Sequence, residues 1–118
     1  MAERISLDAL AARIPDGARL AIPADYAGVA MAATRALLRR RAKGLRLVTV
    51  PTSGLQADML IGAGAVAEIE TSGVTLNEHG LAPRFSAAAK SGRLRIVDST
   101  CPAVHAGLQA AEKGVPFM

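Results

Sequence analysis

The stretch Leu45–Glu70, LRLVTVPTSGLQADMLIGAGAVAEIE, decides the fold of this chain. It begins with a short apolar run, Leu45–Val50, whose β-branched residues are typical of a buried strand. A Pro-Thr-Ser-Gly sequence interrupts the run, and the segment after it carries apolar residues at near-helical spacing and ends in glycines. Val66–Ile69 then begins a second strand. Because strands this apolar need cover on both faces, the stretch predicts a β-α-β unit.

The composition indicates a globular protein. The chain has 118 residues, of which 51% are hydrophobic and 20% charged, as expected for one folded domain. No apolar run reaches the roughly 18 residues that cross a bilayer, and no signal peptide is visible at the start. The single cysteine cannot form an internal disulfide, which favours a reducing cytoplasm. The net charge of +4 permits weak binding of anions, but only 3% of residues are aromatic, which argues against nucleic-acid binding.

Strand and helix patterns alternate along the whole chain. The expected helices cover residues 7–14, 29–43, 55–60, 83–91 and 101–114, and the expected strands cover residues 19–22, 45–50, 66–71 and 94–97. This alternation predicts one α/β domain, residues 1–118, with an open, mostly parallel sheet and helices on both faces. The strand residues expected to be buried are Leu47, Val48, Ile69, Ile96 and Val97.

Ligands of such sheets bind at the carboxyl ends of the strands, so the loops 23–28, 51–54, 72–80 and 98–102 are candidate sites. The segment Asn77–Gly80 contains the only dense polar cluster in these loops, suited to acid–base or covalent chemistry, although composition alone favours a solvated loop. Thr52–Gly54 either presents amides and hydroxyls to an anion at a helix start or simply caps the helix.

Two further patterns have a structural and a functional interpretation. Gly62–Ala67 matches the dinucleotide pattern G-x-G-x-x-A, which needs a strand before it and a helix after it. The predicted order is the reverse, so glycines that end a helix are the preferred interpretation. Five cations near the end of one predicted helix suit the helix dipole, with a phosphate-binding patch as the alternative; they are Arg35, Arg39, Arg40, Arg41 and Lys43.

Cys101 and His105 lie about one helical turn apart at the start of the last predicted helix. A thiol at a helix N-terminus with an imidazole nearby suits nucleophilic catalysis. A packed cysteine and a hydrogen-bonded core histidine are the preferred interpretation. Two such ligands do not make a zinc site, and no metal is expected.

Four segments carry a resemblance to a known family. They are Leu60–Gly64 (LIGAG), Glu78–Phe85 (EHGLAPRF), Cys101–Leu108 (CPAVHAGL) and Gly114–Met118 (GVPFM). In this order and spacing, the chain resembles the α subunit of family I coenzyme A transferases, especially the glutaconate CoA-transferase type. The resemblance covers nearly the whole chain and corresponds to the N-terminal half of the family's subunit.

The resemblance implies an α/β open-sheet fold and transfer of CoA between an acyl-CoA and a free carboxylate. In that family a glutamate of the β subunit attacks the thioester, so this chain would complete the active site of an oligomer with a β-like partner. It implies no tightly bound cofactor, because coenzyme A thioester is the substrate. The substrate-binding residues expected here are Asp25, Tyr26, Ser53, Gly54, Glu78, His79 and Gly80. The alternative is a non-catalytic acyl-CoA-binding or assembly module with the same fold.

Two features depart from the family. Its α subunits usually have Gly-Gly-Phe after the first strand, whereas this chain has Pro23-Ala24-Asp25, in which proline adds bulk and removes an amide donor. The family's subunits are also considerably longer. The sheet is therefore expected to be incomplete, and another chain or copy is expected to cover its exposed surface.

Overall fold

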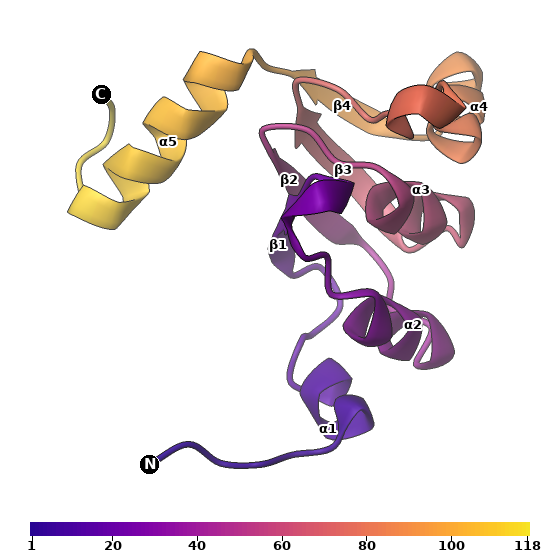
Figure 1. The fold of residues 1–118 in the computed structure, drawn as a ribbon, viewed down its shortest axis with the longest axis vertical. Helices are drawn as coiled ribbons and strands as arrows, with labels where there is room; N and C mark the ends of the chain where they lie inside the picture. The colour runs from indigo at the N-terminus through magenta and orange to yellow at the C-terminus, as the bar shows by residue number, and fades with distance from the viewer.

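The computed structural model describes residues 1–118 and is built on a parallel sheet of four strands (Figure 1). The strands are β1 (Arg19–Pro23), β2 (Leu45–Val50), β3 (Val66–Thr71) and β4 (Arg95–Asp98), and they lie side by side in the order of the sequence. The helices are α1 (Leu7–Ala12), α2 (Met31–Arg39), α3 (Leu55–Gly62), α4 (Pro83–Ser91) and α5 (Cys101–Lys113). Single 3-10 turns, η1 (Asp25–Ala27) and η2 (Asn77–His79), follow β1 and β3.

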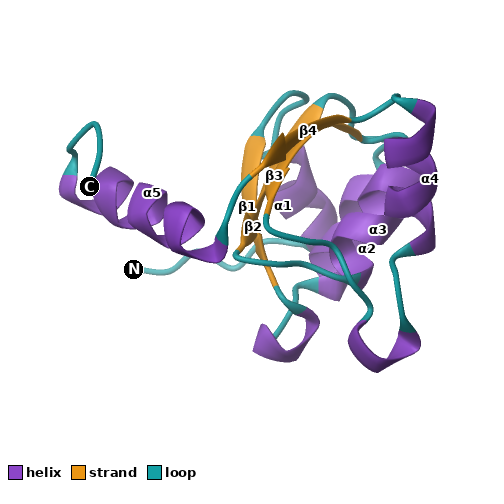
Figure 2. Ribbon diagram, turned by 90° about the horizontal axis from the view of Figure 1, so that it is seen from above, coloured by secondary structure: helices purple, strands orange, loops and turns teal.

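The helices lie on both faces of the sheet, as predicted, but unequally. Figure 2 shows α2, α3 and α4 on one face, while α5 lies on the other face by itself. Within α5, Val104 and Ala110 are buried, and a cavity of about 370 Å³ remains between this helix and the sheet residues Ala21 and Val48. None of the helices has the length and apolarity needed to cross a membrane.

The helix predicted at residues 29–43 is shorter in the structure, where α2 covers Met31–Arg39. Arg41 adopts a left-handed backbone with φ of 58°, and its amide donates to the Leu38 carbonyl. The next amide, that of Ala42, donates to the Leu37 carbonyl, which is the hydrogen-bond pattern of a Schellman helix end. The helix therefore ends two residues before Arg41, and the Ala42 side chain after the turn is buried.

The core lies between the sheet and α2–α4. Leu47 and Ile69 are fully buried there, as predicted. Val48 and Val97 are only half-buried. Val48 lines the cavity under α5, and the register through Glu70 puts Val97 on the same face, which α5 covers incompletely. The prediction for Ile96 was wrong, since 39% of this residue is exposed. Ile96 lies on β4, which is an edge strand with a neighbour on one side only.

Helix α3 lies between α2 and α4, which explains its apolar character on several sides. Asp58 of this helix is fully buried, and its carboxylate accepts hydrogen bonds from the Arg84 and Phe85 amides, both at 2.9 Å. It also accepts a bond from the Arg84 guanidinium at 3.1 Å. Asp58 therefore caps the N-terminus of α4, a position that favours negative charge.

The glycines of the pattern G-x-G-x-x-A end α3 and lead into β3, as preferred from the sequence. Gly64 has φ of 73°, the left-handed conformation that closes a helix. Gly62 is required for a different reason, because a Cβ there would lie 2.1 Å from Cδ of Arg84. The strand-glycine-helix order of a dinucleotide site is absent at this position.

Candidate functional site

The loops at the carboxyl ends of β2 and β3 are joined by a network of hydroxyl groups. The Thr49 hydroxyl lies 2.6 Å from the Pro51 carbonyl oxygen and 2.6 Å from the Thr71 hydroxyl. The Ser72 hydroxyl donates to the same Pro51 carbonyl at 2.8 Å, and Thr71 donates to the Gly73 carbonyl at 2.9 Å. Because Thr49 and Thr71 are buried, these bonds are shielded from water and hold the two loops in one arrangement.

Asp25 ties the loop after β1 to the start of α3. Its carboxylate oxygens lie 3.0 and 3.1 Å from the Leu55 amide, which donates to them. A Cβ on Gly54 would lie 2.2 Å from Oδ2 of Asp25, so the carboxylate can approach the helix only over a glycine. The first amide of α3, that of Leu55, is therefore already occupied by a side chain of the same chain.

Ser53 is positioned by backbone pairing with the loop after β3. Its amide donates to the Gly73 carbonyl at 3.2 Å, and its carbonyl accepts from the Thr75 amide at 3.0 Å. The side chain is buried, and its hydroxyl has no hydrogen-bond partner in the protein. A buried hydroxyl without a partner is costly, which marks Ser53 as a position with an unused polar group.

Glu78, His79 and Gly80 lie at the turn η2 and its end, on the surface. The Glu78 carboxylate and the His79 imidazole are 3.8 Å apart, and about 80% of each side chain is exposed. Gly80 has φ of 92°, and its carbonyl accepts from the Leu76 amide, which closes the loop on itself. Tyr26 of η1 is also exposed, with 82% of the residue accessible to solvent.

The seven expected substrate-binding residues thus fall into separate groups at one edge of the sheet. Asp25 meets Gly54 and Leu55, Ser53 pairs with the loop after β3, and Glu78 meets His79. Of the four cavities in the structure, none is lined by any of these seven residues. The edge is therefore an open surface in this chain alone.

Sequence reasoning missed Gln56, which is buried at the start of α3. Its Nε2 donates to the Thr34 hydroxyl at 2.9 Å, which links α3 to α2, while its Oε1 has no partner in the protein. Two polar residues, Gln56 and Asp58, in a helical segment that is otherwise apolar were the available signal. Burial of both Gln56 and Ser53 places two unsatisfied polar atoms near the N-terminus of this helix.

Two of the five cations near the end of α2, Arg39 and Arg40, have side chains engaged in structural contacts. The Arg39 guanidinium pairs with Asp8 at 3.1 Å, and Arg40 pairs with Asp16 at 2.9 Å and donates to two carbonyls near the end of α1. The Lys43 amide also donates to Asp16, at 3.0 Å. This backbone hydrogen bond, followed by the bond from Arg40, lowers the pKa of the Asp16 carboxyl below its ordinary value.

The preferred interpretation of Cys101 and His105 was wrong, because both are exposed. The Cys101 thiol lies 3.3 Å from the Ser72 hydroxyl, and no hydrogen bond joins it to His105. Thr100 caps α5 ahead of them, with its hydroxyl accepting from the Ala103 amide at 3.3 Å. The pair therefore forms no nucleophile–base unit in this chain.

A crystal structure of a cysteine-to-serine variant of the decarboxylase AibA/AibB is similar to this chain. The TM-score is 0.82, with 29% identity over 97% of this chain. This chain spans 45% of the length of that neighbour. The similarity supports the CoA-transferase-like fold that the sequence resemblance implied. No protein-family model and no curated protein matches the sequence.

Proposed function

We propose that this chain is an α-type subunit of an enzyme that moves CoA between an acyl-CoA and a free carboxylate, with the catalytic glutamate on a β-like partner. The observation that carries the proposal is the carboxyl edge of the sheet, where polar loops gather and no cavity is lined by them. A partner chain seated on this edge would provide the second wall of a pocket. The two-part name of the similar decarboxylase AibA/AibB supports an assembly of two kinds of chain.

The environment of Glu78 argues against a covalent role for this residue. A carboxylate nucleophile needs donors that stabilise the oxyanion formed from the thioester. Glu78 and its neighbour His79 are about 80% exposed, and the Leu55 amide at the start of α3 is occupied by Asp25. In the proposal, Glu78 and His79 hydrogen-bond the substrate across the subunit interface, and Tyr26 packs against it.

The other expected residues, Ser53, Gly54 and Gly80, are small and would contribute mainly by leaving space at the edge. Gly80 leaves the backbone accessible at the edge, and Gly54 gives room to the Asp25 carboxylate. The Ser53 hydroxyl is buried and has no partner in the protein, so in this scheme it would bond only a substrate group that enters beside it. Coenzyme A thioester is the substrate in this scheme, so no tightly held cofactor is required. The glutamate that attacks the thioester comes from the β-like partner in this scheme.

Decarboxylation of an acyl-CoA is the second candidate function. It is favoured by the similar structure, which is that of a decarboxylase. The two reactions differ in their products, because transfer exchanges CoA between carboxylates and decarboxylation releases carbon dioxide. The assembly and the edge of the sheet would be the same in both.

Intact-mass spectrometry with a panel of acyl-CoAs tests the proposal. We expect no CoA adduct on the purified chain, and an adduct on the partner only after a β-like subunit is added. Glu78→Gln should leave that adduct in place, as should the control Glu112→Gln on the exposed face of α5. An adduct on this chain that disappears in Glu78→Gln would contradict the proposal. Release of carbon dioxide without CoA exchange would favour decarboxylation, the second candidate function. Binding of acyl-CoA without either reaction would indicate a non-catalytic module.

A further inference from the structure

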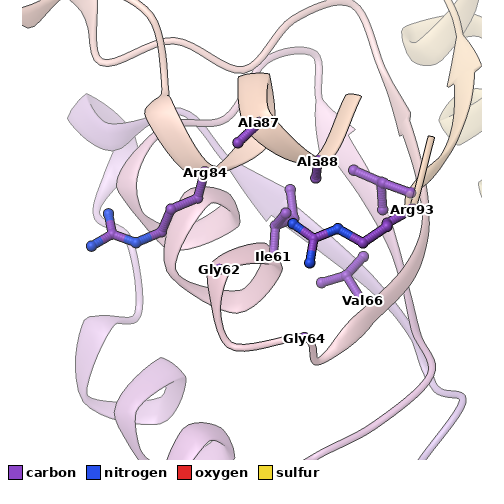
Figure 3. A pocket seen from close by; sticks show the side chains of 9 residues that line it. Ile61, Gly62, Gly64, Val66, Arg84, Ala87, Ala88 and Arg93 are labelled. Atoms are coloured by element: carbon purple, nitrogen blue, oxygen red, sulfur yellow. The ribbon is translucent and has the colours of Figure 1, made fainter. Parts of the chain in front are cut away.

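A concave site lies at the amino ends of the strands, on the edge opposite the loops described above. It is a cavity of about 310 Å³ between α3 and α4, next to the first residues of β3 and β4 (Figure 3). Its apolar walls come from Ile61, Val66, Ala87, Ala88 and Leu94. Ligand pockets begin at about 300 Å³, so this cavity suits a small molecule with an apolar body.

The only charged groups that line the cavity are two guanidinium groups, those of Arg84 and Arg93. Arg84 is already paired with buried Asp58 at 3.1 Å, and its side chain points away from Arg93 (Figure 3). Arg93 has no carboxylate partner, and its Nε donates to the Ser91 hydroxyl at 3.0 Å. In Figure 3 the Arg93 guanidinium reaches over the cavity toward Ile61.

We propose that this cavity binds a small amphipathic carboxylate, with its hydrocarbon part against Ile61, Val66 and Leu94 and its carboxylate on Arg93. Arginine has a fork of donors that matches the two oxygens of a carboxylate, and the terminal nitrogens of Arg93 have no protein acceptor. Burial of the hydrocarbon part adds a favourable contribution for each methylene removed from water. A bare anion such as phosphate gains the charge contact but leaves the apolar walls exposed.

The site is independent of the proposed CoA chemistry, because it shares no residue with the carboxyl edge. It also differs from a dinucleotide site, although Gly62 and Gly64 border it, because these glycines end a helix there. Because Gly62 has no side chain, the aliphatic part of the Arg84 side chain can lie against its backbone, where it forms one wall of the cavity.

Titration of the isotopically labelled chain with hexanoate, followed by amide chemical shifts, tests this site. We expect saturable shifts confined to residues 61–66 and 84–94. Binding should be weaker by about tenfold in Arg93→Gln, which loses the charged contact to the carboxylate. Arg95→Gln is the matched control. It removes the same charge two residues away, where Arg95 pairs with Glu68 at 2.9 Å and does not line the cavity. Hexanoate should bind Arg95→Gln as it binds the parent.

Two other probes separate the contributions of charge and of apolar surface. Hexanol, which has no charge, and inorganic phosphate, which has no hydrocarbon part, should each bind more weakly than hexanoate. The proposal is overturned if hexanoate causes no saturable shifts in these segments, or if Arg93→Gln and Arg95→Gln bind it equally. Phosphate binding as tight as that of hexanoate would also overturn it, since the apolar walls would then contribute nothing.

Discussion

A methyl group on Gly62 would lie 2.1 Å from Cδ and 2.9 Å from Nε of the Arg84 side chain. The stem of Arg84 is held in this position because its guanidinium bonds the buried Asp58 carboxylate. The ion pair between Asp58 of α3 and Arg84 of α4 therefore depends on the absence of a side chain at position 62. Adding volume at residue 62 forces Arg84 away from its partner.

Gly62→Ala should lower the free energy of unfolding by about 1–3 kcal/mol, because the displaced Arg84 guanidinium leaves the buried Asp58 carboxylate with fewer donors. In an Arg84→Ala background the same substitution should have almost no effect, because the obstructing stem is absent. Gly107→Ala is the control, since Gly107 lies in α5 with nothing within 4 Å of the added atom. Urea unfolding of the four variants measures this coupling. Equal costs of Gly62→Ala with and without Arg84 would contradict the explanation.

Asp16 gives a prediction for the dependence of stability on pH. Its pKa is lowered in the folded chain, first by the Lys43 amide and then by Arg40. Because the pKa is lower in the folded chain, the ionised carboxylate stabilises the fold at any pH above the ordinary pKa of 3.8. This contribution is lost as the pH falls through the lower pKa of the folded chain. The stability difference between the parent and Asp16→Asn should therefore be full at neutral pH and shrink below pH 3.8. Denaturant melts over this range measure it, and a difference that grows on acidification would show the opposite linkage.

At the scale of elements, β2 and β4 differ in how their apolar residues are covered. Leu47 on the central strand β2 is 1% exposed, whereas Ile96 on the edge strand β4 is 39% exposed. Both residues belong to parallel ladders, and the sequence pattern predicted burial for both. How much a strand side chain contributes to the free energy of unfolding therefore depends on whether neighbouring strands and helices cover it, and not on the residue type alone.

Leu47→Ala should cost about 2–5 kcal/mol of unfolding free energy, because it leaves a cavity in the core. Ile96→Ala should cost about 1 kcal/mol or less, as is usual for a residue with partial exposure. Denaturant unfolding of the two variants under one condition compares them directly. Similar losses for both would mean that β4 is covered in solution by something outside this chain.

The sequence predicted the order and type of every strand and α-helix, because the two differ in the period of their apolar residues. It did not predict the 3-10 turns η1 and η2, whose residues were expected to be loops. It misplaced the end of α2, which comes before the left-handed turn at Arg41 and the buried Ala42. It also identified the loops of the carboxyl edge but not their contacts. The bond from Leu55 to Asp25 joins residues 30 positions apart, and no local pattern specifies such a pairing.

At the scale of the whole molecule, one face of the sheet is poorly covered. Helix α5 is the only helix on that face (Figure 2), and exposed apolar residues follow it at Val115, Phe117 and Met118. Monomers seldom leave contiguous apolar surface in water, so we expect another surface to pack here.

The purified chain should therefore associate, either with itself or with a β-like partner. Native mass spectrometry and light scattering over a range of concentrations should show species larger than one chain of 12.1 kDa. Phe117→Ser should reduce self-association, whereas Lys90→Ser on exposed α4 should not. A monomer that unfolds cooperatively, with a midpoint independent of concentration, would contradict this expectation.

The order of the strands has a consequence for folding of the chain during its synthesis on the ribosome. Leu20 pairs with Leu47, Leu47 with Ile69, and Ile69 with Ile96, so each new strand joins the one made just before it. Synthesis from the N-terminus can therefore extend the sheet step by step, without waiting for distant residues or displacing a strand already in place. Each nascent intermediate has one growing edge, and the next strand to emerge is the one that covers it.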